Sequence, residues 1–283
     1  MSDTLEPARE LGAFLRTRRE RLNPRDFGLP ERRQSRRTPG LRREEVAELA
    51  GISIDYVVRL EQGRGLHPSM NVVEALARAL RLAPDERTYF LDLARHRSRP
   101  AGESATATAT ATAAPLARLV ADLSPLPAML INHRFDILAF NPEMARLQLD
   151  FDTRLPPSRH NSAWLCLMRP EMRDYYLDRD RVVREGVAHV RAAWAAHPHD
   201  RALADLIAEF STDEDFARVW AEGDVKSNGR GSKTVRHPEV GTFSVYFETL
   251  APLGDQDQRL VICRPADDAS RAALDRLSAT PAA

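Results

Sequence analysis

A low-complexity segment near the middle of the chain places the strongest constraint on how it can fold. Residues 101–114 read AGESATATATATAA and show no apolar periodicity. Because alternating Ala and Thr cannot supply a packed apolar face, this composition is typical of a flexible tether. A chain of 283 residues is also long enough for two domains of ordinary size. The sequence therefore predicts one domain over 7–97, a linker over 98–114 and a second domain over 115–279.

The charge changes sign at the same place. Lys and Arg together number 41, as do Asp and Glu, so the formal net charge is zero. The chain up to Pro100 holds 20 basic and 15 acidic residues, and the remainder holds 21 basic and 26 acidic residues. The zero is thus the cancellation of two opposite halves. The first half is suited to a polyanion, whereas phosphates should repel the second half.

Composition excludes several classes of protein. Hydrophobic residues make up 43% of the chain, enough for a core in each domain, which argues against wholesale disorder. No run approaches the roughly 18 apolar residues of a membrane span, and the first residues lack the pattern of a signal peptide. Two cysteines, Cys166 and Cys263, do not make a disulfide framework. We therefore expect a soluble, cytoplasmic protein without membrane association.

Before the tether, the apolar pattern is helical throughout. Three- and four-residue spacing and cap signals predict five helices and no strand. A helix over Arg42–Ala50 is expected to end at Gly51, and Ser53 is expected to cap the helix that follows. The residues expected to be buried in and between these two helices are Val46, Leu49, Ala50, Ile52, Val57 and Leu60.

After the tether, the pattern indicates an α+β domain with an antiparallel sheet. A short helix is expected over Leu116–Leu123, helices are expected over most of 161–222, and a closing helix is expected over Ala266–Leu277. Runs of alternating or β-branched residues between turn signals predict the strands. The expected strands are Ala128–Asn132, Asp136–Phe140, Ser232–Arg236, Thr242–Leu250 and Arg259–Arg264.

Residues 42–63 carry the strongest functional signal in the sequence. A helix, a tight turn and a Ser-capped second helix form a helix-turn-helix whose second helix can enter a major groove. Arg59 suits guanine, Asp55 suits cytosine and Ile54 suits a thymine methyl, although Asp55 could instead complement the helix dipole. The full set of expected DNA-binding residues is Arg42, Arg43, Ser53, Ile54, Asp55, Tyr56, Val58, Arg59, Arg36 and Arg37.

Two features around this motif extend the prediction. Arg19 and Glu61 are expected to form an internal ion pair rather than to contact DNA. Residues 23–40 form a long Arg-rich connection, which is either a phosphate or minor-groove arm or a solvated loop in an Arg-biased chain.

If the connection is an arm, changing Arg36 and Arg37 to Ala should flatten the salt dependence of DNA binding. A titration of DNA affinity against salt concentration measures the slope. An unchanged slope of affinity against salt concentration would contradict the arm hypothesis.

Several segments resemble a known family. Residues 11–95, and in particular SIDYVVRLEQG at 53–63, resemble the xenobiotic-response-element (Cro/repressor-like) helix-turn-helix domain. RRTPGLRREEVA at 36–47 resembles an actinobacterial branch whose C-terminal half is an MmyB-like ligand-binding domain. The segments that are similar to that domain are WAEGDV at 220–225, GSK at 231–233, HPEVG at 237–241 and FETL at 247–250.

The resemblance implies that the second domain is PAS-like and binds a small hydrophobic effector such as a fatty acid. Ligand pockets are mostly apolar with a few polar anchors, so aromatic residues could line it and a basic residue, Arg173 among the candidates, could hold a carboxylate. For any one of these aromatic residues, a place in the ordinary core is favoured over a place in the pocket wall. The expected ligand-binding residues are Phe135, Phe140, Trp164, Leu167, Arg169, Tyr175, Tyr176, Trp194, His237 and Phe247.

Catalysis finds little support in the sequence. His197-Pro-His199 with Asp200 lacks the helical spacing of zinc ligands, and no Gly-x-Ser-x-Gly is present. We expect no catalytic residue, metal or cofactor. The predicted function is a sequence-specific transcriptional regulator, acting as a dimeric repressor on double-stranded operator DNA and responding to an apolar effector. In the alternative, the second domain is only a dimerisation or protein-interaction module without a ligand.

Overall fold

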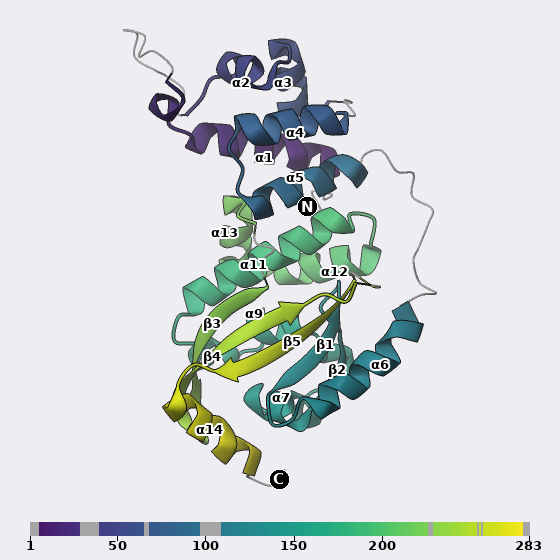
Figure 1. Cartoon of the computed structure of the whole chain (residues 1–283), viewed down its shortest axis with the longest axis vertical. Coiled ribbons are helices and arrows are strands. Elements are labelled where there is room, and N and C mark those ends of the chain that lie inside the picture. Colours follow the sequence, from purple (N-terminus) through teal and green to yellow (C-terminus); the bar gives the residue numbers. More distant parts are fainter. Residues whose placement is uncertain are drawn as a thin grey trace. The chain divides into compact units, whose positions relative to one another are not determined.

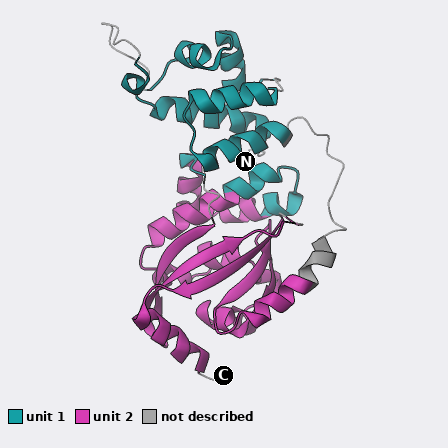
Figure 2. Ribbon diagram, in the orientation of Figure 1, with its two compact units in different colours: residues 1–101, 191–205, 222–227 teal, residues 102–190, 206–221, 228–283 magenta. Residues whose placement is uncertain are grey.

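The computed structural model describes residues 6–28, 40–64, 68–96, 109–225, 229–253, 255 and 257–279. Figure 1 labels its helices and strands, and Figure 2 colours the two compact units into which the chain divides. Unit 1 comprises 1–101, 191–205 and 222–227, and unit 2 comprises 102–190, 206–221 and 228–283. Unit 1 therefore includes two short segments from the second half of the chain. Within the described ranges, no helix is long and apolar enough to cross a membrane.

The first part of unit 1 is helical, as predicted. Its helix α1 packs against α3 and α5, and α4 packs against α2 and α5. The core between them consists of large apolar side chains with almost no exposure, including Leu11, Leu15, Val57 and Phe90. The elements are α1 Pro7–Arg21, the 3-10 helix η1 Pro24–Phe27, α2 Arg43–Ala50, α3 Ile54–Glu61, α4 Met70–Ala79 and α5 Pro84–His96.

The turn between α2 and α3 follows from two local signals. Gly51 ends α2 in the left-handed region at φ 65°, where its N–H bonds to helix carbonyls. The Ser53 hydroxyl accepts the Tyr56 N–H at 3.2 Å and so caps α3. Both cap predictions are confirmed.

The predicted contact between α2 and α3 needs one correction. Val46, Val57 and Leu60 are buried as expected, but Leu49 is 41% exposed. The buried face of α2 is centred on Val46 and Ala47, so Leu49 and Ala50 in its last turn lie away from the core centre.

Unit 2 contains a five-stranded sheet with the order β2-β1-β5-β4-β3, and every neighbouring pair is antiparallel. The α+β prediction is confirmed. The strands are β1 Ala128–Asn132, β2 Ile137–Phe140, β3 Arg230–His237, β4 Gly241–Leu250 and β5 Gln258–Pro265. The helices before the long α11 are α6 Ala109–Asp122, α7 Pro142–Leu147, α8 Phe151–Arg154, η2 Pro157–Arg159, α9 Ser162–Leu167 and α10 Met172–Tyr175. The later helices are α11 Arg179–Ala196, α12 Arg201–Phe210, α13 Glu214–Glu222 and α14 Asp268–Ala279.

Two helix starts differ from the sequence prediction. Helix α6 begins at Ala109, within the predicted linker 98–114, because Ala is a strong helix former; 98–108 lie outside the described residues. Helix α14 begins at Asp268 rather than Ala266, because the Asp267 carboxylate accepts the Ser270 N–H at 2.7 Å. These backbone and side-chain hydrogen bonds from Ser270 lower the pKa of Asp267.

Asn141 joins the first two strands to the helix that follows them. Its Oδ1 accepts the Met144 N–H at 3.1 Å and thereby caps α7, whose first residue is Pro142. The same oxygen accepts the Ala128 N–H at 2.9 Å, and Nδ2 donates to the Leu126 carbonyl at 2.8 Å. One buried amide therefore fixes where α7 leaves the sheet.

Candidate functional site

Helix α3 presents a polar outer face next to its N-terminus. Its inner face, Val57, Leu60 and Glu61, is buried. Ile54 is 51% exposed, and Asp55 and Arg59 are also exposed. Of the other residues predicted to bind DNA from this helix and its cap, Ser53 is exposed, whereas Tyr56 and Val58 are half-buried.

The side chains of Asp55 and Arg59 have no hydrogen-bond or ion-pair partner among the described residues. The guanidinium donors of Arg59 and the carboxylate acceptors of Asp55 thus point outward with their bonding capacity unused. Asp55 also lies in the first turn of α3, where its charge complements the helix dipole. The two roles of Asp55 are compatible.

Glu61 joins α1, α2 and α3 from inside the helical core. Its Oε1 accepts Arg19 Nε at 2.7 Å, and its Oε2 accepts Arg43 Nε at 2.7 Å. Arg19 also donates to the Leu41 carbonyl at 2.8 Å. The predicted internal pair of Arg19 and Glu61 is confirmed. Because both side chains are buried, this ion cluster fixes the angle at which α3 leaves the core.

The two arginines at the start of α2 form ion pairs within the chain but keep part of each side chain exposed to solvent. Arg43 uses Nε for Glu61, and its side chain remains 44% exposed. Arg42 contacts the Glu44 carboxylate at 3.3 Å, and its side chain is 34% exposed. Both side chains therefore remain accessible to a phosphate, although Glu44 competes for Arg42.

Both ends of the Arg-rich connection are fixed to unit 1. The Arg81 guanidinium lies 4.1 Å above the Phe27 ring and donates to the Asp26 carbonyl at 2.9 Å. At the other end, Gly40 adopts φ 71° where a Cβ would lie 2.3 Å from the Arg19 carbonyl oxygen. Arg36 and Arg37, predicted as DNA-binding residues, lie outside the described residues.

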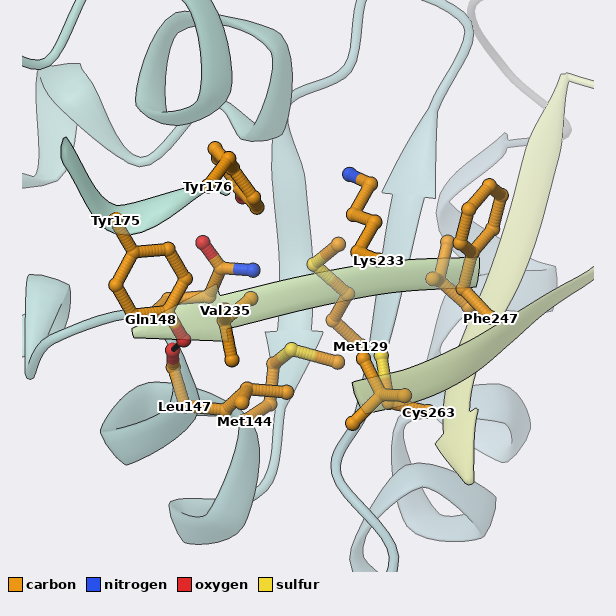
Figure 3. A pocket seen from close by; sticks show the side chains of 12 residues that line it. Met129, Met144, Leu147, Gln148, Tyr175, Tyr176, Lys233, Val235, Phe247 and Cys263 are labelled. Atoms are coloured by element: carbon orange, nitrogen blue, oxygen red, sulfur yellow. Dashed lines mark hydrogen bonds between the residues drawn. The ribbon is translucent and has the colours of Figure 1, made fainter. Parts of the chain in front are cut away.

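Unit 2 contains a pocket of about 70 Å³ on one face of its sheet (Figure 3). Strands β1, β3, β4 and β5 contribute to it, together with α7 and the region around α10. Its wall is mainly apolar and includes two methionines, two tyrosines, one cysteine and one lysine. The lining residues are Met129, Met144, Leu147, Gln148, Tyr175, Tyr176, Lys233, Val235, Val245, Phe247, Val261 and Cys263.

Three of the predicted ligand-binding residues, Tyr175, Tyr176 and Phe247, line this pocket. Phe140 and Trp164 instead pack against a separate core cluster around Phe151. The remaining predicted residues do not form part of the pocket wall as the structure describes it; they are Phe135, Leu167, Arg169, Trp194 and His237.

Two of the predicted carboxylate anchors bind backbone carbonyls instead. Arg169 donates to the carbonyls of Gln148 and Leu149 at 2.9 and 3.2 Å, and His237 Nε2 lies 3.1 Å from the Arg146 carbonyl. Tyr175 donates its hydroxyl proton to the Leu147 carbonyl at 2.5 Å. These three side chains bind carbonyls at and just after the end of α7, and so they fix the backbone behind the pocket wall. The third anchor candidate, Arg173, pairs with Asp213 at 2.8 Å.

Nine of the twelve lining residues were not among the predicted ligand-binding residues, and among these nine Lys233 is the one with a positively charged side chain. Its Nζ lies 5.1 Å from the centre of the Tyr176 ring and 5.2 Å from the centre of the Phe247 ring. One signal could have indicated it. Of the 41 basic residues in this chain, 39 are Arg, so a Lys within a predicted strand is unusual here. Its inward direction, however, depends on strand register.

Three titratable groups of the pocket wall, Cys263, Tyr175 and Tyr176, are uncharged near neutral pH. Burial raises the pKa of the Cys263 thiol from 9.0 to about 11, and the nearby Lys233 charge offsets this only in part. Burial likewise raises the pKa values of Tyr175 and Tyr176 well above their ordinary range. None of these groups supplies a negative charge to the pocket.

Ionisation of the Cys263 thiol should lower the free energy of unfolding at alkaline pH. A pKa that is higher in the folded state stabilises the protein fully below pH 9, and this contribution is lost as pH rises through 11. The two-unit difference corresponds to about 2.7 kcal/mol. Urea unfolding at pH 8 and pH 11 should show this loss, and Cys263→Ser should lose correspondingly less. Cys166→Ser is the control, and equal losses in wild type and Cys263→Ser would contradict the assignment.

A helical unit with an outward recognition helix, in one chain with a sheet domain that holds an apolar pocket, defines a DNA-binding regulator with a ligand-binding domain. Comparison with protein families agrees with this class. A helix-turn-helix domain model matches residues 10–90, and a model of the MmyB-like transcription regulator ligand binding domain matches residues 113–277. The chain belongs to this MmyB-like family of transcription regulators. No curated protein matches it.

Proposed function

We propose that this transcription regulator binds operator DNA as a homodimer through α3 and that a small apolar effector, such as a fatty acid, occupies the pocket of unit 2. The observation that carries the DNA-binding part is the outer face of α3, where Asp55 and Arg59 are exposed without side-chain partners among the described residues. Such groups can read base edges in a major groove. The site of action is the cytoplasm, where the protein has access to chromosomal DNA.

The homodimer part of the proposal follows from the short stretch of DNA that one helix-turn-helix can contact. A single helix-turn-helix contacts few base pairs, and a two-fold dimer reads two half-sites about one helical turn apart. Isologous pairing of two chains would match a palindromic operator. Sedimentation equilibrium of the protein with and without an operator fragment measures the stoichiometry, and a single chain on each operator would contradict this part.

The effector part is supported by the chemistry of the pocket wall. The wall is mostly apolar with a few polar groups, as ligand sites are. Its volume of about 70 Å³ is small for a long chain. Met129 and Met144 are unbranched, flexible side chains that can move aside without a change in the backbone. Effector binding is therefore expected to rearrange these two side chains.

The experiment that tests the whole proposal is affinity selection of genomic DNA fragments by the full-length protein, with and without a lipid extract. We expect enrichment of fragments that share a palindromic sequence, and we expect the extract to change their recovery. Failure to enrich any common sequence would contradict operator binding. Enrichment that lipids leave unchanged, together with an unchanged melting temperature, would indicate that unit 2 serves dimerisation or protein interaction alone.

A further inference from the structure

We propose that the Lys233 ammonium is an anion receptor, so that the effector carries a carboxylate that pairs with it while an apolar body fills the rest of the pocket. This inference rests on the proposed effector function and deepens it. It adds to the proposed effector the side chain that recognises its charge, in place of the anchors expected from the sequence.

Strand geometry brings Lys233 to the pocket. Gly229, Gly231, Lys233 and Val235 are alternate residues of the chain at and along β3, so they face the same side of the sheet. A Cβ on Gly231 would lie 2.6 Å from Cε1 and Cζ of Phe247, which means that the Phe247 ring lies across this glycine. Glycine at this position therefore lets the ring lie beside the Lys233 side chain.

The two aromatic rings hold the ammonium without neutralising it. Lys233 Nζ lies 5.1 Å from the ring centre of Tyr176 and 5.2 Å from that of Phe247. Figure 3 shows the Lys233 side chain between these two residues. Cation–π contacts attract a cation through the ring quadrupole but carry no net charge. No carboxylate forms an ion pair or hydrogen bond with the Lys233 side chain in the part of the chain that the structure describes.

The absence of a counter-charge distinguishes Lys233 from Arg169, the fully buried arginine of unit 2. Arg169 is buried but bonded to carbonyls, and its neighbour Glu171 lies 3.3 Å from its Nε. The phenols of Tyr175 and Tyr176 and the thiol of Cys263 are neutral, as their raised pKa values require. A half-buried cation among neutral groups is costly unless an anion reaches it. An effector carboxylate would supply that anion.

The use of Lys in place of Arg also fits the receptor role. An ammonium is a compact point charge with three donors on a flexible stem, whereas guanidinium needs a planar, two-point partner. A pocket of about 70 Å³ has room for roughly five water-sized groups. A compact cation leaves most of that space to the ligand, and Met129 and Met144 can give way to a longer apolar body.

The test compares decanoate with decan-1-ol, which match in chain length and differ in charge. Binding of both to the full-length protein is measured by calorimetry near neutral pH. We expect decanoate to bind wild type at least tenfold more tightly than decan-1-ol. Lys233→Met should remove this preference while decan-1-ol binding persists, and Lys233→Arg should retain part of it. Arg236→Met, which removes a charge from an exposed position of β3, is the matched control and should keep the preference.

The possible outcomes distinguish a failure of the Lys233 assignment from a failure of the proposed effector function. Equal binding of both ligands to wild type, or a preference that survives in Lys233→Met, overturns the receptor role but leaves effector binding intact. If neither ligand binds, the proposed effector function fails for this ligand type. Thermal unfolding of the ligand-free protein then still tests Lys233 itself. In the ligand-free protein the Lys233 ammonium has no bound anion, so its charge should not stabilise the fold. Lys233→Met should therefore melt at the same or a higher temperature than wild type. A fall of several degrees in the melting temperature would overturn the inference.

Discussion

Glu61→Gln is expected to lower the free energy of unfolding of unit 1 by about 3 kcal/mol or more, at the lower end of the range for breaking a buried ion pair. Gln keeps the size of the side chain but removes the charge that faces Arg19 and Arg43. Arg19 is 3% exposed, so its guanidinium would lose its buried carboxylate and keep the Leu41 carbonyl, Glu20 and at most the neutral amide oxygen of the new Gln as acceptors. The carbonyl and the half-exposed Glu20 do not replace a buried carboxylate.

Thermal unfolding followed by circular dichroism measures this effect. A loss of 3 kcal/mol corresponds to a fall of more than about 10 °C for a domain of this size. Glu44→Gln is the matched control, because Glu44 contacts Arg42 at 3.3 Å with its side chain 55% exposed, and such surface pairs contribute about 0–1 kcal/mol. Similar melting temperatures for the two variants would show that the Glu61 cluster is not a net source of stability.

Arg59→Ala is expected to weaken operator binding by about five- to 150-fold, which corresponds to the loss of one bidentate base contact of about 1–3 kcal/mol. The reason is structural: Arg59 is exposed on α3 and has no side-chain partner among the described residues, so its donors are available to a guanine. Fluorescence anisotropy with a selected operator at fixed salt gives the affinity. Selection of sequences by the variant gives the change in specificity.

The pattern of loss distinguishes a base contact from a phosphate contact. Arg59→Ala should relax the sequence preference at one base pair in each half-site, whereas Arg42→Ala should weaken all sequences alike and lower the salt slope by about one. Arg154→Ala, which removes an exposed arginine of unit 2, should leave both quantities unchanged. If Arg59→Ala resembled Arg154→Ala, α3 would not be the recognition helix.

Local signals made the helix-turn-helix predictable. The end of α2 and the start of α3 depend on Gly51 and Ser53, and each acts through hydrogen bonds within four residues of itself in sequence. Strand positions were also predictable, because alternation and turn residues are local. Bounds were less accurate where a side chain decides them, as at Asp267, whose carboxylate delays the start of α14.

The pocket was less predictable, because its wall depends on contacts between distant segments. Arg169 and His237 looked like anchors for a ligand, but the chain folds so that both meet carbonyls near the end of α7. Conversely, Lys233 was expected only as a residue of the strand Ser232–Arg236 and of the GSK segment. Its role depends on the register of β3 and β4, which pairs Gly231 with Phe247 and Lys233 with Val245. Composition cannot reveal such pairings.

The three side chains that bind the carbonyls near the end of α7 have a consequence for how this family member can change over evolutionary time. Arg169, Tyr175 and His237 bond to the backbone behind the pocket wall, whereas Met129 and Met144 line the pocket with flexible apolar side chains. The residues that fix the backbone are thus different from the two methionines that shape the apolar surface. Substitution at the two methionines can therefore change which molecules fit the pocket, while the hydrogen bonds that hold its backbone are left unaltered.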